Sequence, residues 1–156
     1  MAEPTSLPIA SLQKRISAFV IDDITIALFF LIIFYDQLLV IASHTSGMIS
    51  ADEITLIQAQ LRQFSVDNLL MMLSIKVLYH AVPVWQNGMT LGKYIMKIRV
   101  VDLKTGARPS LIQAFLRAIL RIGSEVFFYL GFIMAFMMPL NQTFHDKFSN
   151  CVVIDA

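Results

Sequence analysis

The sequence predicts an all-α integral membrane protein, with two to four membrane-embedded helices and a small cytoplasmic lobe that holds a short two-stranded β element. Of its 156 residues, 57% are hydrophobic, and the mean hydropathy is +0.70. A small water-soluble domain has too much surface to hide so much apolar area. Residues 24–33 and 126–140 carry no charge. Two valine-rich runs, 98–102 and 151–155, are typical of short strands.

The first half of the chain predicts two transmembrane helices joined on the periplasmic side. The apolar run at about 16–42 exceeds the ~20 residues that cross a bilayer core of ~30 Å. An amphipathic helix is expected over about 50–64, because Ser50 stands three residues before a glutamate, as in a capping box. The second span is expected over about 66–86, with Trp85 as its interfacial anchor.

The second half predicts a cytoplasmic loop at 87–110, membrane-associated helices within 111–140 and a cytoplasmic tail at 141–156. An isolated strand is not stable in water, so the two valine-rich runs are expected to pair. If they pair, residues 111–140 must return to the side that they left, as a surface helix followed by a re-entrant element. A simple third span, with an external C-terminus, is the alternative that the sequence leaves open.

The distribution of charge predicts the orientation. Seven lysines and arginines lie within residues 93–121, and Lys14 and Arg15 precede the first apolar run, whereas the loop between the first two spans has only Arg62. By the positive-inside rule, the N-terminus and the 87–121 region are cytoplasmic. The net charge of +1 gives no overall basic field to attract nucleic acid, so no nucleic-acid partner is expected.

Several ionisable residues fall inside the predicted spans. Asp22 and Asp23 lie in the first, while Lys76 and His80 share one face of the second at a similar depth. Charged groups in a membrane normally face protein and find partners. We therefore expect Lys76 to pair with one of the two aspartates, with His80 nearby. The pair is interpreted in three ways: as a helix-packing contact, as part of an ion or proton path, or as a ligand site.

No pattern of an enzyme or of a metal centre is present. His44, His80 and His145 fall in three separate regions, so no metal site is expected. The run 88–93, GMTLGK, is one residue too short between its glycines for a phosphate-binding loop. No nucleophile stands with a nearby base, and neither catalysis nor a cofactor is expected.

A second group of residues is expected to fasten the lobe to the helices. Asp146 and His145 come just before the second valine-rich run, and Lys93 lies near the first. If the strands pair, the carboxylate of Asp146 comes within reach of these basic groups. Arg15, at the cytoplasmic end of the first helix, is a further candidate partner. We predict that Asp146 is a structural clasp rather than a transport residue.

Four blocks, in order, carry a family resemblance: KRISAFVIDD, NGMTLGKYIMKIRVVDLKTGARPS, FLRAILR and NQTFHDKFSNCVV. Together they resemble the RDD family of bacterial membrane proteins over about 13–155. The resemblance makes Arg15 the family's arginine and Asp22 its first aspartate. The second aspartate is best matched by Asp146, with Asp23 as the alternative. The resemblance implies an inner-membrane protein, and transport, including cation–proton exchange, has been suggested for this family.

Assembly is expected from the small number of spans. Two or three helices leave little room for a water-filled path within one protomer. We therefore expect a homo-oligomer in the lipid bilayer, or a place in a larger membrane complex. Two functions follow. The protein transports ions or another small ligand, or it is a non-transporting accessory or scaffold subunit of such a complex.

Overall fold

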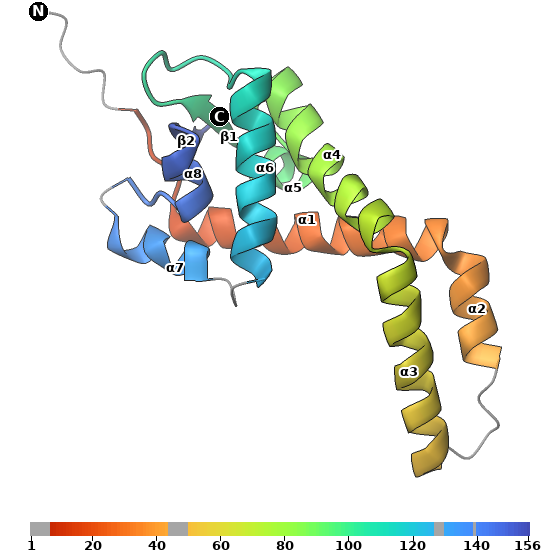
Figure 1. The fold of residues 1–156 in the computed structure, drawn as a ribbon. Coiled ribbons are helices and arrows are strands. Elements are labelled where there is room, and N and C mark those ends of the chain that lie inside the picture. The colour runs from red at the N-terminus through yellow and green to blue at the C-terminus, as the bar shows by residue number, and fades with distance from the viewer. Residues whose placement is uncertain (1–6, 44–49, 127–129, 139) are drawn as a thin grey trace, which may run out of the picture.

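The computed structural model describes residues 7–43, 50–126, 130–138 and 140–156, and the side chains of 130–133 are outside the description. Most of the described chain is helical (Figure 1). The elements in order are α1 (Leu12–Ile33), α2 (Tyr35–Ser43), α3 (Ala51–Asp67), α4 (Leu69–Asn87), α5 (Leu91–Ile95), β1 (Ile98–Asp102), α6 (Leu111–Val126), α7 (Leu130–Met137), α8 (Phe144–Phe148) and β2 (Cys151–Asp155).

Two of these helices, α1 and α4, are long and apolar enough to cross a membrane. The single helix expected over 16–42 is divided in the structure, because α1 ends at Ile33, with Phe34 as its C-cap, and α2 continues in a new direction (Figure 1). The Phe34 side chain is buried and meets the ring of Phe64 on α3 edge-on, with ring centroids 5.2 Å apart. This contact fixes the bend.

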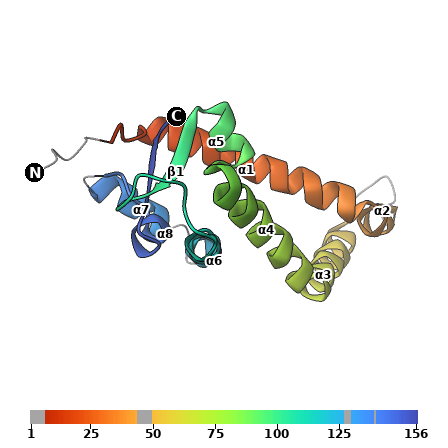
Figure 2. The same cartoon turned by 90° about the horizontal axis from the view of Figure 1, so that it is seen from above.

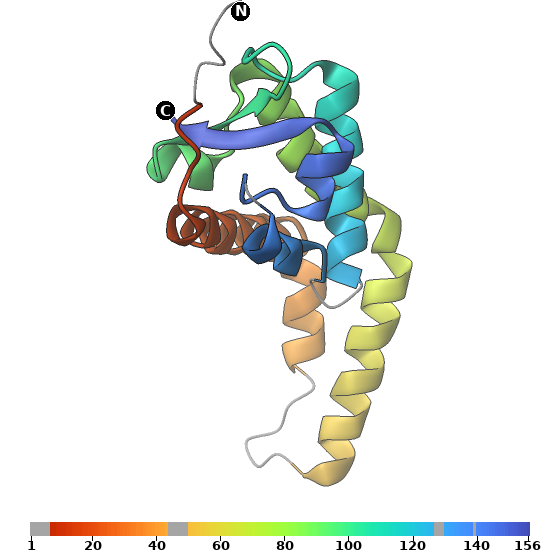
Figure 3. The ribbon, with the colours of Figure 1, turned by 90° about the vertical axis from the view of Figure 1, so that its left-hand side faces the viewer.

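The helices α2 and α3 form an arm that stands away from the rest of the molecule (Figure 3). The predicted capping box is present at the start of α3, where Ser50 and Glu53 each accept a hydrogen bond from the other's backbone N–H. At the other end of α3, Asn68 interrupts the helix before α4. Seen from above, α1 and α4 diverge from each other toward this arm (Figure 2).

The two valine-rich runs form the predicted two-stranded sheet. β1 and β2 pair antiparallel, with Val100 opposite Val153. Ile9 adds an isolated bridge to Ile154, so the stretch before α1 also lies against β2. We call β1, β2, α5 and α8 the lobe, and it gathers around the first turns of α1 (Figure 3).

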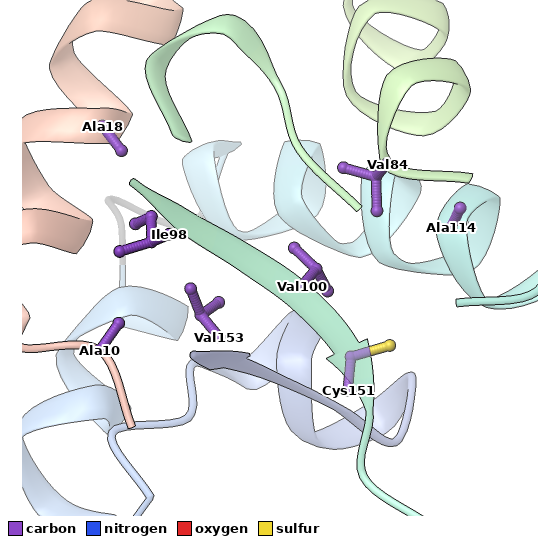
Figure 4. Close-up of a cluster of buried hydrophobic side chains, with 8 residues drawn as sticks. All are labelled: Ala10, Ala18, Val84, Ile98, Val100, Ala114, Cys151 and Val153. Atoms are coloured by element: carbon purple, nitrogen blue, oxygen red, sulfur yellow. The ribbon is translucent and has the colours of Figure 1, made fainter. Parts of the chain in front are cut away.

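A small apolar core holds the lobe to the helices. Its side chains are mostly short, and they come from the stretch before α1, from α1, α4 and α6, and from both strands (Figure 4): Ala10, Ala18, Val84, Ile98, Val100, Ala114, Cys151 and Val153. Short side chains let the backbones approach closely. One close approach is at Gly92 on α5, where a Cβ atom would come within 2.2 Å of the Ala18 carbonyl oxygen.

The helix α6 runs across α1 rather than along it (Figures 1 and 2). Its apolar side chains face outward and its arginines face inward, the reverse of a surface helix in a soluble protein. Its exposed side chains are apolar, and Ile112 is 79% exposed. Arg117 and Arg121 point inward, at 6% and 4% exposed. A helix in water places its charges outside, so this arrangement fits a helix whose outer face meets lipid.

Candidate functional site

The carboxylate of Asp22 has four donors around it. Its side chain is fully buried in α1. It accepts hydrogen bonds from the hydroxyls of Tyr79 (2.8 Å) and Thr90 (2.6 Å) and from the backbone N–H of Gly92 (2.9 Å). The ammonium of Lys93 lies 3.3 Å from its Oδ2 atom. One carboxylate therefore joins α1, α4 and the turn of the lobe that contains α5.

The sequence predicts that Lys93 lies near Asp146, but in the structure Lys93 has other partners. It lies against Asp22 and donates to the Thr90 hydroxyl at 3.1 Å, and it makes no described contact with Asp146. Burial lowers the pKa of Lys93 to about 8, while Asp22 opposes that shift and Arg117 adds to it. A lysine with such a pKa loses its proton at a lower pH than an ordinary lysine does.

Asp146 is fully buried and bridges two arginines. Arg117 of α6 donates to its Oδ1 atom, with Nη2 at 2.7 Å and Nε at 2.8 Å. Arg15 of α1 pairs with Oδ2, as the sequence had suggested for a further partner, and also donates to the Asn141 carbonyl. Burial alone would raise the pKa of Asp146, but Arg117 and Arg15 hold it well below its usual value.

Asp146 also fixes the start of α8. Its backbone N–H donates to the Thr143 hydroxyl, and its carboxylate accepts from the Thr143 N–H, a capping box. The neighbouring His145 is buried, and burial holds its pKa well below the usual value despite the opposing charge of Asp146. His145 is therefore neutral at pH 7.

The direct ion pair of Lys76 is formed with a glutamate of α6, not with one of the aspartates of α1 that the sequence suggests. Lys76 lies 2.6 Å from Glu125 of α6. Asp23 instead faces Arg121, at 3.2 Å, and Arg121 also approaches Glu125, at 3.5 Å. The reason is that α6 packs against α4 and brings its own charges between the two spans. Of the predicted span residues, His80 is buried next to the Tyr79 ring and contacts neither Lys76 nor Asp22 in the described interactions.

Six residues of this interior are not among the site residues predicted from the sequence: Tyr79, Thr90, Gly92, Arg117, Arg121 and Glu125. A signal for three of them was present. Arg117, Arg121 and Glu125 are spaced by four within a run that is otherwise largely apolar, so they share one helix face. Charges on one face of an apolar helix indicate that this face is turned to protein.

A cavity of about 270 Å³ lies among these groups, between α1, α6, α7 and the lobe. Its lining includes five basic residues, Arg15, Lys93, Arg117, Arg121 and His145. Among the described residues of the lining none is Asp or Glu, because the acidic partners lie behind the cations. The remaining wall is mostly apolar: Leu12, Ile16, Ala18, Phe19, Ile98, Ala135, Phe136, Thr143 and Val153.

In the part of the chain that the structure describes, no three His, Cys, Asp or Glu side chains come together as metal ligands. The arrangement suits an anion instead, since guanidinium and ammonium groups are the side chains that bind carboxylates and phosphates.

Two helices are long and apolar enough to cross a membrane, and a small lobe closes a charged interior beside them, which is an arrangement typical of a membrane protein. The family model of the RDD family matches residues 9–150, and the chain belongs to this family of membrane proteins. No curated protein and no solved structure matches it. Of the two candidates for the family's second aspartate, Asp146 is the one that contacts Arg15.

Proposed function

We propose that the protein is a multi-pass protein of the bacterial inner membrane, with a cytoplasmic N-terminus, that binds a small anionic ligand in the basic cavity and transports it. The observation that carries the proposal is the lining of the cavity. Four cationic side chains reach it, and no carboxylate stands among its described residues.

The ion pairs behind the cavity leave positive charge in excess. Asp146 alone serves both Arg15 and Arg117. Arg121 and Lys76 lie against Asp23 and Glu125, and Lys93 pairs with Asp22, so five cations of this interior face four acids among the described residues. An anion that enters the cavity would balance this excess of one positive charge.

A metal cation fits this interior less well. The oxygens of Asp22 already take four donors, and those of Asp146 are occupied by two arginines and a backbone N–H. A cation would have to displace these donors. We therefore favour an anion over the cation of a cation–proton exchanger, with Lys93 as the group that takes up and releases the proton. Binding and transport, rather than catalysis, are proposed.

Assembly is part of the proposal. One protomer offers two spanning helices, too few to surround a path, so we propose a homo-oligomer or a partner within a membrane complex. The arm supports the second candidate function, that of a non-transporting accessory subunit. Apolar side chains on it are exposed, with Leu39 at 53%, Val40 at 58% and Leu56 at 51%.

The test is flux in proteoliposomes that contain only this protein. Uptake of acetate or phosphate is compared with sodium-driven proton movement. We expect anion uptake, and we expect Lys93→Met to reduce it while Lys147→Met, which removes an exposed lysine outside the cavity, does not. Sodium–proton exchange without anion uptake would support a cation exchanger instead. Absence of any flux from the folded protein would favour the accessory role.

A further inference from the structure

The apolar wall of the cavity reaches the surface of the molecule. Ile16 of α1 and Phe136 of α7 both line the cavity, and they are also 50% and 66% exposed. The charged side chains of the cavity are at most 9% exposed. The lining of the cavity therefore combines buried residues with charged side chains and apolar residues that reach the surface.

The exposed apolar part of the lining continues as an apolar track along α1. Ile16, Val20, Ile24 and Leu28 are spaced by four, so they share one helix face, and each is about half exposed, between 47% and 55%. Because α1 is a candidate spanning helix, this track leads from the cavity into the hydrocarbon of the bilayer. A ligand that leaves the cavity past Ile16 meets lipid rather than water.

We propose that the ligand is an amphiphile with one oxyanion headgroup and one acyl chain. This inference rests on the proposed anion site. The headgroup lies against Arg15, Lys93, Arg117 and Arg121, and the chain passes between Ile16 and Phe136 and then along α1.

The shape and chemistry of the cavity favour this ligand over a free inorganic anion. A site built for a small hydrated ion surrounds it with polar groups, whereas here much of the lining is apolar. A volume of about 270 Å³ is close to the lower limit of ~300 Å³ for small-molecule pockets, so it holds a headgroup and the first part of a chain. The rest of the chain stays in the bilayer, where burying each methylene group contributes ~0.8 kcal/mol.

The test uses three probes, with the protein in phosphatidylcholine nanodiscs. Dodecanoate has the headgroup and the chain, acetate has the headgroup alone, and dodecyltrimethylammonium has the chain with the opposite charge. Binding is measured by equilibrium titration after correction for partition into empty nanodiscs. We expect saturable binding of dodecanoate, much weaker binding of acetate and no saturable binding of the ammonium amphiphile.

A matched pair of variants tests the exposed apolar part of the lining. Phe136→Ser removes an apolar side chain from the cavity mouth, and Met137→Ser changes its exposed neighbour, which does not line the cavity. We expect the first to weaken dodecanoate binding by about tenfold, as the loss of a large apolar contact gives, and to leave acetate binding unchanged. The second should change neither.

Two other sets of results would overturn different parts of the proposal. Equal affinity for acetate and dodecanoate, or equal effects of the two variants, would remove the acyl chain from the proposal and leave the anion site. Saturable binding of the ammonium amphiphile as strong as that of dodecanoate, or no saturable binding of either anion, would overturn the anion site as well.

Discussion

Replacing Asp146 by asparagine keeps the shape of the side chain and removes the charge that holds two arginines. The carboxylate is fully buried, and Arg15 and Arg117 each bond one of its oxygens. An asparagine offers one acceptor oxygen and no charge, so both guanidinium groups lose their counter-ion. Breaking a buried ion pair by removing one partner costs ~3–5 kcal/mol. We expect the free energy of unfolding of Asp146→Asn to fall by that amount.

The assay is denaturant unfolding in one fixed detergent, followed by circular dichroism. The control is Asp155→Asn, which breaks the pair between Lys14 and Asp155 at 2.7 Å. Those side chains are 40% and 43% exposed, so water screens the pair and its loss should cost less than ~1 kcal/mol. If the two variants lose equal stability, Asp146 is not the clasp that the geometry indicates.

The pH dependence adds an independent check. The pKa of Asp146 in the folded protein lies well below the usual value of 3.8, so the unfolded chain takes up the proton first as the pH falls. The stabilisation by the carboxylate is therefore complete at neutral pH and decreases below about pH 4. The difference between the wild-type protein and Asp146→Asn should be constant above that pH and should shrink below it. A difference that does not change with pH would contradict the reasoning.

Three further predictions follow from the interior. Gly92→Ala should destabilise the protein by ~3 kcal/mol or more, because its Cβ would meet the backbone at 2.2 Å. The control Gly123→Ala has nothing within 4 Å of its Cβ, so it should be neutral or stabilising by up to ~1 kcal/mol. Equal thermal unfolding of the two variants would refute this prediction. Lys76→Met should lower thermal stability and Glu125→Gln should recover part of it in the double variant, whereas additive losses would exclude their pair. The pKa of Lys93 is about 8 in the folded protein and 10.5 in the unfolded chain, so between these pH values the unfolded chain holds the extra proton. The free energy of unfolding should therefore rise by about 3 kcal/mol from the lower to the higher pH, and Lys93→Met should lack this rise.

The elements that the sequence predicts best are those with a local cause. The two helices that are long enough to cross a membrane follow from continuous apolar runs, and the paired strands follow from two valine-rich segments. The capping box of α3 also follows from residues three positions apart. Each of these features depends on neighbours in the sequence, and so the pattern is visible without the fold.

The features that the sequence did not predict have distant causes. The bend at Phe34 depends on a ring contact with Phe64, which lies on another helix. The partner of Lys76 depends on the way α6 packs onto α4, since several acids lie at a suitable depth and spacing alone does not choose among them. Opposite charges in a spanning region predict that pairs exist, but the tertiary packing decides which ones form.

The bridge between Ile9 and Ile154 has a consequence for the order of events during synthesis. Ala10 donates its N–H to the Val153 carbonyl, and Asp155 donates to the Pro8 carbonyl, so the stretch that precedes α1 is bonded to one made more than 140 residues later. The lobe therefore cannot be complete before β2 has been made. Until β2 is available, β1 lacks its partner strand and residues 8–10 lack their hydrogen bonds. Because every described helix precedes β2 in the sequence, the closure of the lobe follows the synthesis of these helices.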